Sequence, residues 1–245
     1  MAAVATQLPD GLSILMPVFN EIERIERALD ETLAVDLPCP FELVIVDDGS
    51  TDGTVEYLRN RPLPDNVRVH FHAKNQGKGA AVRTALTDAR LRFSAIFDAD
   101  LEYDPADLAV LLEPLRTGRD VNVVFGVRTF DGYTSHSFLF VMGNRGVTLA
   151  ANVLFNVYIH DLMTCHKAMY TETFRALPLR SKGFSIEPEI TARLLQRGER
   201  IYEVPVRYRA RASEEGKKLT AVDGFRVLWT LLRCRLRAPN GMTTR

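Results

Sequence analysis

Three acidic residues, Asp98, Asp100 and Glu102, follow the apolar run 95–97 at alternate positions. Side chains alternate along a strand, so Asp98 and Asp100 should project to the same side, and Glu102 joins them if the extended backbone continues. Carboxylates at the carboxyl end of a buried strand provide the hard oxygen ligands that Mg²⁺ or Mn²⁺ prefers. Alternatively, the aspartates only cap a turn before a helix that begins near Pro105.

Acids also follow an earlier predicted strand, 41–46, in the sequence Asp-Asp-Gly-Ser at 47–50. A later loop, 74–79, reads Lys-Asn-Gln-Gly-Lys-Gly and leads into an alanine-rich helix. This loop is not a Walker A motif, because no Lys-Ser or Lys-Thr stands at the required spacing. Gly77 and Gly79 therefore either approach a ligand or simply let the chain enter a tightly packed helix.

Hydrophobic patterning predicts the elements that would position these residues. The predicted strands are 12–16, 41–46, 67–71, 95–97 and 121–127, and the helices between and after them end near 33, 59, 90 and 115. Each connection is long enough for a crossover, which predicts an α/β fold with a Rossmann-like, mostly parallel sheet and helices on both faces. The first turn has no Gly-x-Gly-x-x-Gly, which argues against a dinucleotide enzyme.

The composition limits the classes of function. Lys+Arg and Asp+Glu are both 31 in 245 residues, so the formal net charge is +0, which argues against a general nucleic-acid binder. Cys39, Cys165 and Cys234 are far apart and have no histidine at metal-ligand spacing, so we expect no disulfide framework and no zinc site in a reducing cytosol. No apolar stretch approaches the length that crosses a bilayer, and residues 1–12 lack a signal-peptide pattern.

Four motifs in order and spacing carry a resemblance to a known family. They are residues 17–21 (Pro-Val-Phe-Asn-Glu), 44–54, 75–79 and 97–101. The chain resembles the family-two glycosyltransferases with a GT-A fold, and within them the dolichol-phosphate mannose synthases and bacterial polyprenyl-phosphate sugar synthases. The resemblance covers nearly the whole chain, from Leu12 to Arg237.

The resemblance implies a hexosyltransferase whose nucleotide-sugar donor, GDP-mannose or a UDP-sugar, lies in the crevice at the ends of the first strands. Asp98 and Asp100 would hold the metal that binds the diphosphate, with Glu102 as a third ligand where relatives commonly have Gln. The expected donor-binding residues are Pro17, Phe19, Glu21, Val46, Asp47, Asp48, Lys78, Ala99 and Lys218.

The nature of the acceptor decides which other groups the site needs. A lipid monophosphate carries its own negative charge and needs cations rather than a general base. The resemblance places Arg128, Arg211 and Lys218 at basic positions that bind donor or acceptor phosphates, and Arg145 and Lys217 are further candidates. With Asp98 and Asp100, Arg128 and Arg211 complete the expected catalytic set. These residues predict a metal-dependent, inverting transfer of a mannose-type or glucose-type hexose to polyprenyl or dolichyl phosphate.

Three other interpretations remain open. A soluble or saccharide hydroxyl acceptor would need a base, for which His166, Glu187 and Glu189 are candidates, although both glutamates could simply favour a helix N-terminus. Relatives tend to have Gly and an aromatic residue where this chain has Cys165 and His166, which bears on the acceptor. A nucleotide-sugar-binding subunit without turnover and a nucleotidyltransferase are the other two.

We expect a single GT-A domain over residues 1–237, followed by a tail at 238–245. Its parts would be a nucleotide-sugar-binding half at 12–128, an acceptor-binding half at 129–220 and a basic amphipathic helix at 221–237. This helix mixes apolar residues with arginines and carries Trp229, a pattern typical of an interfacial membrane helix. The apolar segment 130–159 suits either a membrane surface or an ordinary core. We therefore predict peripheral attachment to the cytoplasmic face of a membrane.

Overall fold

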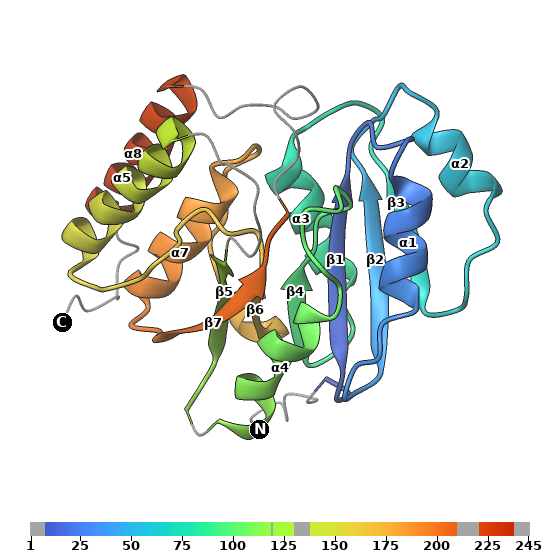
Figure 1. Cartoon of the computed structure of the whole chain (residues 1–245), viewed down its shortest axis with the longest axis horizontal. Helices are drawn as coiled ribbons and strands as arrows, with labels where there is room; N and C mark the ends of the chain where they lie inside the picture. Colours follow the sequence, from blue (N-terminus) through green and yellow to red (C-terminus); the bar gives the residue numbers. More distant parts are fainter. Residues whose placement is uncertain (1–7, 119, 130–137, 210–220, 238–245) are drawn as a thin grey trace, which may run out of the picture.

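The computed structural model describes residues 8–118, 120–129, 138–209 and 221–237. Its centre is a seven-stranded sheet in the order β3-β2-β1-β4-β6-β5-β7 (Figure 1). The strands are β1 (Leu12–Val18), β2 (Phe41–Asp47), β3 (Val67–Phe71), β4 (Phe93–Ile96), β5 (Val123–Thr129), β6 (Lys167–Tyr170) and β7 (Ile201–Arg207). The predicted α/β class and mostly parallel sheet are confirmed.

The sheet departs from the predicted pattern at one strand, β6. This strand runs antiparallel to both of its neighbours, β4 and β5, whereas the other neighbouring pairs are parallel. Sequence patterning did not reveal β6, because four residues are too few to establish a period. Its insertion brings the segment before Lys167 next to the end of β4.

Helices cover both faces of the sheet. They are α1 (Ile25–Leu33), α2 (Thr54–Asn60), α3 (Lys78–Asp88), α4 (Asp107–Thr117), α5 (Phe138–Phe155), α6 (Thr171–Arg175), α7 (Ile186–Gln196) and α8 (Ala221–Leu236). Alternation along β1 sends Ile14 into the core under α1 and α4, and Leu15 into the core under α3 and α7. Burial of these two apolar clusters holds the carboxyl ends of the strands in place.

Helices α5 and α8 form an outer layer that lies side by side over α7 (Figure 1). Buried residues join the three helices, among them Ala151 of α5, Ala192 of α7 and Leu231 of α8. The predicted C-terminal helix is therefore present. Within the residues described, no helix is both long and apolar enough to cross a membrane.

Two boundaries differ from prediction for local reasons. β1 does not stop at Pro17 but continues to Val18. Proline has no backbone N–H, but β4 pairs with β1 only as far as Leu15, so no hydrogen bond to β4 is lost at Pro17. β4 ends at Ile96, so the acids that follow it lie in a turn, where Leu101 has a φ of 61°. The extended continuation that would have placed Glu102 beside Asp98 and Asp100 is wrong.

Candidate active site

The acidic segments that follow β2 and β4 meet at the carboxyl edge of the sheet. β1 lies between these two strands and is parallel to both. From β1 the chain winds outward through β2 and β3 and then returns to the opposite side of β1 at β4. Such a reversal opens a crevice at the strand ends, where open α/β sheets bind ligands.

Lys78 and Asp98 form the centre of the site. The Lys78 ammonium lies 2.7 Å from Oδ2 of Asp98, 2.8 Å from Oε1 of Glu187 and 2.9 Å from Sγ of Cys165. Burial disfavours the ammonium, but the neighbouring acidic groups, Asp98 foremost, together outweigh it and hold the pKa of Lys78 well above its ordinary value. Burial likewise opposes ionisation of Asp98, yet Lys78 lowers the pKa of that carboxyl. Both groups are therefore charged near neutral pH.

Asp48 holds the loop from which Lys78 projects. Its carboxylate accepts hydrogen bonds from the backbone N–H of Gly77 at 2.6 Å and of Gln76 at 3.0 Å, and His72 contacts it at 2.6 Å. Gly77 has a φ of 94°, and a Cβ there would collide with the carbonyl oxygen of Lys182. The glycine is required for chain geometry and close packing at the start of α3.

Asp47 turns the chain after β2. One of its oxygens accepts hydrogen bonds from the backbone N–H of Gly49 at 3.0 Å and Ser50 at 2.9 Å. Its other oxygen is buried and has no hydrogen-bond partner among the described residues. A role for Asp47 or Asp48 in holding the base or ribose of a donor stays a prediction.

The remaining predicted donor residues lie near the same edge of the sheet in different environments. Pro17 and Val46 are register partners, but the Val46 side chain belongs to the core beneath α3. Ala99 is buried in the turn after β4. Phe19 is half exposed, and the backbone N–H of Glu21 donates to Oγ1 of Thr54 at 3.1 Å.

Asp100 and Glu102 belong to the turn that follows Asp98. The backbone N–H of Glu102 donates to Oδ1 of Asp100 at 3.1 Å, and the Tyr208 hydroxyl donates to Oε2 of Glu102 at 2.8 Å. In the part of the chain that the structure describes, no three His, Cys, Asp or Glu side chains are grouped to hold a metal ion. Mg²⁺ is commonly held by one or two carboxylates together with substrate phosphates, and the partly buried carboxylates Asp98 and Asp100 fit that arrangement.

Arg128, at the end of β5, is not a solvated charge. It forms a two-point ion pair with Asp161, with 2.6 Å from Nε to Oδ2 and 2.9 Å from Nη2 to Oδ1. Asn144 donates to the same carboxylate at 3.1 Å, and the guanidinium lies 5.0 Å from the Tyr208 ring centre. Burial opposes the charge, but Asp161 outweighs it and raises the pKa of Arg128. A phosphate that binds Arg128 would therefore share the guanidinium with Asp161.

The other predicted cations lie elsewhere, and one further lysine, Lys167, is buried near the site. Arg211, Lys217 and Lys218 lie outside the described residues, and Arg145 is exposed on α5. Lys167 is fully buried, donates to the carbonyls of Leu162 and Thr164, and lies over an aromatic ring. Burial lowers the pKa of Lys167 to about 8.

The three candidate bases lie in different environments. His166 is fully buried, with its ring 4.1 Å from that of Tyr103 and 5.5 Å from that of Phe97, and burial lowers its pKa to about 3. It is a neutral core residue that an acceptor cannot reach. Glu189 accepts hydrogen bonds from the backbone of residues 180 and 181. Glu187, by contrast, joins the central cluster through Lys78.

The contact of Glu187 and Cys165 with Lys78 was not predicted, although Glu187 was a candidate base and Cys165 stood in a segment of interest. Glu187 stands near the start of α7, where an acid is expected for helix stability alone. Only the packing of α7 beside α3 places its carboxylate at Lys78. No local pattern in the sequence carries that contact.

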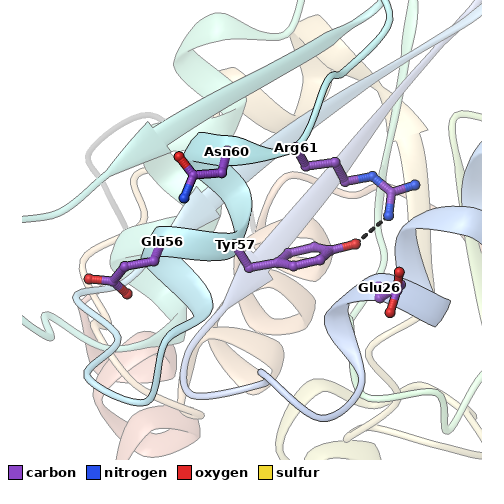
Figure 2. Close-up of a pocket in the computed structure, with 5 residues that line it drawn as sticks. All are labelled: Glu26, Glu56, Tyr57, Asn60 and Arg61. Atoms are coloured by element: carbon purple, nitrogen blue, oxygen red, sulfur yellow. Dashed lines mark hydrogen bonds between the residues drawn. The ribbon is translucent and has the colours of Figure 1, made fainter.

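A cavity lies away from this cluster. Its volume is about 420 Å³, and it is lined by residues of α1 and α2 and the position after α2 (Figure 2). The close-up shows the Tyr57 hydroxyl turned toward Arg61, with which it shares a hydrogen bond. None of the acids or cations of the central cluster lines this cavity.

Comparison with known proteins gives consistent matches. A family model described as glycosyl transferase family 2 matches residues 13–176. The chain is 29% identical over 239 residues to glycosyltransferase AglJ of Haloferax volcanii, covering 95% of this chain and 74% of that protein. It is 27% identical over 245 residues to undecaprenyl-phosphate mannosyltransferase of Micrococcus luteus, covering 91% and 97%.

A solved structure has the same fold. It is glucosyl-3-phosphoglycerate synthase from Mycobacterium tuberculosis, in complex with Mn²⁺, UDP and glucosyl-3-phosphoglycerate. It matches with a TM-score of 0.72 at 21% identity, covering 95% of this chain and 82% of that one. The family model spans the chain from β1 to α6 and includes the whole Lys78–Asp98 region. The chain therefore belongs to glycosyl transferase family 2 and is a glycosyltransferase with the GT-A fold.

Proposed function

We propose that this enzyme transfers a hexose from a nucleoside-diphosphate sugar to a polyprenyl phosphate, with inversion at the anomeric carbon and with Mg²⁺ or Mn²⁺ bound. The observation that carries the proposal is the Asp98–Lys78–Glu187 cluster at the carboxyl edge of the sheet. It combines carboxylates suited to a metal with a buried cation suited to a diphosphate. The named activity of the Micrococcus luteus relative supports the acceptor class.

The acceptor chemistry agrees with the cluster. An oxygen of the acceptor phosphate attacks the anomeric carbon from the face opposite the diphosphate, and the new C–O bond forms as the bond to the diphosphate breaks. The nucleoside diphosphate departs with the electron pair, and no proton has to be removed from the phosphate nucleophile. A buried, stacked His166 is therefore compatible with this reaction, whereas a hydroxyl acceptor would need an accessible base.

The residues have separate roles in this mechanism. Asp98 and Asp100 would hold the metal, which supplies positive charge to the leaving diphosphate. Lys78 adds a positive charge at the same diphosphate and is kept in place by Glu187. Arg128 lies at the end of β5, where it orients the acceptor phosphate while Asp161 fixes its plane.

Membrane attachment forms part of the proposal, because a polyprenyl phosphate resides in a bilayer. Helix α8 exposes Phe225 (74%), Trp229 (65%) and Leu236 (74%), while Leu231 and Cys234 on its other side are buried. Exposed aromatic and leucine side chains flanked by arginines suit peripheral binding at a lipid surface. We place the enzyme at the cytoplasmic face, where nucleotide sugars and anionic lipids would both be available.

The experiment is a nucleotide-release assay with purified enzyme, Mn²⁺, a polyprenyl phosphate, and GDP-mannose or UDP-sugars. We expect GDP or UDP release only when the lipid phosphate is present, and loss of that release in Asp100→Asn. The exposed residue Asp65 offers a matched control, Asp65→Asn, which should keep full activity. Release that ignores the lipid phosphate but follows a sugar or small alcohol would instead identify a hydroxyl acceptor.

A further inference from the structure

A basic cavity of about 310 Å³ lies between the loop that precedes α7 and helix α8. Its lining includes Arg180, Ser181 and Lys182 from the loop and Arg226, Trp229 and Arg233 from α8. No acidic residue is among the described residues that line it. The cavity therefore gathers four cationic side chains around one aromatic ring.

Two of these cations are not neutralised by any residue that the structure describes. Arg180 and Lys182 are exposed, and their side chains make no hydrogen bond or ion pair with other described residues. The two arginines of α8 lie near acidic residues that do not line the cavity. Arg226 pairs with Asp223 at 3.1 Å, and Arg233 lies 3.8 Å from the buried carboxylate of Glu189, which Arg193 also approaches at 3.9 Å. The cavity thus keeps a net positive charge.

Ser181 points to a ligand rich in acceptor oxygens. Only 7% of Ser181 is exposed, and its hydroxyl is buried without a hydrogen-bond partner among the described residues. Leaving a buried hydroxyl without a partner is unfavourable, so such a group is usually satisfied by a protein atom, water or ligand. A phosphate oxygen in the cavity would accept its hydrogen bond while neutralising the neighbouring cations.

The position of the cavity on α8 indicates where the phosphate comes from. Phe225, Trp229, Leu232 and Leu236 are exposed and recur at helical spacing, so they share one side of α8. Trp229 belongs both to this apolar side and to the cavity lining. If the apolar side enters the acyl region of a bilayer, the cavity lies at the depth of the headgroups.

We infer that this cavity binds the headgroup phosphate of an anionic membrane phospholipid, separately from the acceptor lipid. The inference deepens the membrane attachment of the proposed function and rests on it. The cavity loop also contacts the catalytic side of the molecule, since the Lys182 carbonyl accepts a hydrogen bond from the Ala80 backbone at 3.2 Å. A bound headgroup therefore stabilises the loop against which the Lys78 segment packs.

Trp229 provides the readout, because it is the single tryptophan of the chain and lines the cavity. The full-length enzyme is titrated with phosphatidylcholine vesicles, with and without phosphatidylglycerol, and the Trp229 emission is followed. We expect a blue shift at much lower lipid concentration when phosphatidylglycerol is present. The Arg180→Gln/Lys182→Gln variant should weaken this binding about 25-fold, since each charge near an anionic surface contributes roughly fivefold.

The matched control is Arg235→Gln/Arg237→Gln, which removes the same charge from exposed positions at the end of α8 outside the cavity lining. It should retain most of the preference for phosphatidylglycerol. Equal weakening in both variants would mean diffuse attraction and would overturn the site. Arg226→Gln is a second cavity variant, and it should weaken binding about fivefold.

Two further arms separate the possible outcomes. If inorganic phosphate or glycerol phosphate alone shifted the emission as strongly as vesicles do, the cavity would be a soluble-phosphate site and the inference would be wrong. Turnover is assayed in detergent with a short-chain polyprenyl phosphate. Normal turnover without any preference for phosphatidylglycerol would refute the cavity site and leave the proposed function intact. Vesicle binding is measured without substrate, so the test of the cavity remains valid even if the enzyme shows no turnover.

Discussion

The ammonium of Lys78 lies 2.7 Å from the carboxylate of Asp98, which is one of the two proposed metal ligands. Lys78 also contacts Glu187 at 2.8 Å, so it has a second carboxylate to retain when Asp98 turns to a metal. This arrangement keeps the Asp98 carboxylate ionised and neutralised in the absence of ligand.

Lys78→Met tests this relationship. Removal of the ammonium eliminates a group that competes for Asp98, so the affinity for Mn²⁺ measured by calorimetry should rise. The same change removes a positive charge at the leaving group and should lower kcat by about 10²-fold to 10³-fold. Arg200→Met is the control, because this exposed cation lies outside the site and makes no contact with Asp98. Unchanged Mn²⁺ affinity in Lys78→Met would show that the ammonium does not occupy the metal position.

Asp161→Asn should destabilise the fold strongly. It leaves the Arg128 guanidinium buried with no carboxylate, and breaking a buried ion pair from one side costs about 3–5 kcal/mol. Urea unfolding gives the free-energy difference. The double variant Arg128→Met/Asp161→Leu removes both charges and should recover much of the loss. A cost below about 1 kcal/mol in the single variant would mean that solvent reaches the pair.

Gly77→Ala should reduce both stability and activity. The substitution places a Cβ at a φ of 94° and against the Lys182 carbonyl, which displaces the start of α3 and with it Lys78. Gly198→Ala separates the two effects, since Gly198 has a φ of 76° but no atom within 4 Å of its added Cβ. We expect about 1–2 kcal/mol for Gly198→Ala from the backbone alone, and more for Gly77→Ala. Equal costs by thermal unfolding would argue against the close packing at Gly77.

Acid should destabilise the enzyme through His166. Burial lowers the pKa of His166 to about 3, below its ordinary value near 6.5, so the unfolded state binds the proton more readily. The stabilisation is complete above about pH 6.5 and is lost as the pH falls toward 3. At pH 5 the loss amounts to about 2 kcal/mol relative to pH 7.

His166→Phe keeps an aromatic ring between Tyr103 and Phe97 but cannot be protonated. Its unfolding free energy should therefore fall less than that of the natural enzyme between pH 7 and pH 5. If His166→Phe shows the full acid sensitivity, other groups are responsible for it.

Much of the scaffold follows from local sequence. Alternating apolar strands and helices predict the parallel sheet, because burial on both faces requires continuous apolar runs. The acids after β2 and β4 could be placed at one edge of the sheet for the same reason, since parallel strands end on the same side. The C-terminal helix was likewise predicted from the mixture of apolar residues and arginines around Trp229.

The arrangement of the side chains depended on tertiary structure. The four residues of β6 are too short for a periodic signal, yet their antiparallel insertion carries Cys165 and His166 to the end of β4. Glu187 reaches Lys78 only because α7 packs beside α3 on the same face of the sheet. Contacts between residues far apart in the chain arise from packing of whole elements, and local sequence patterns do not predict them. The sequence by itself therefore determined the edge of the sheet at which the proposed site lies, and the tertiary structure decided which charges meet there.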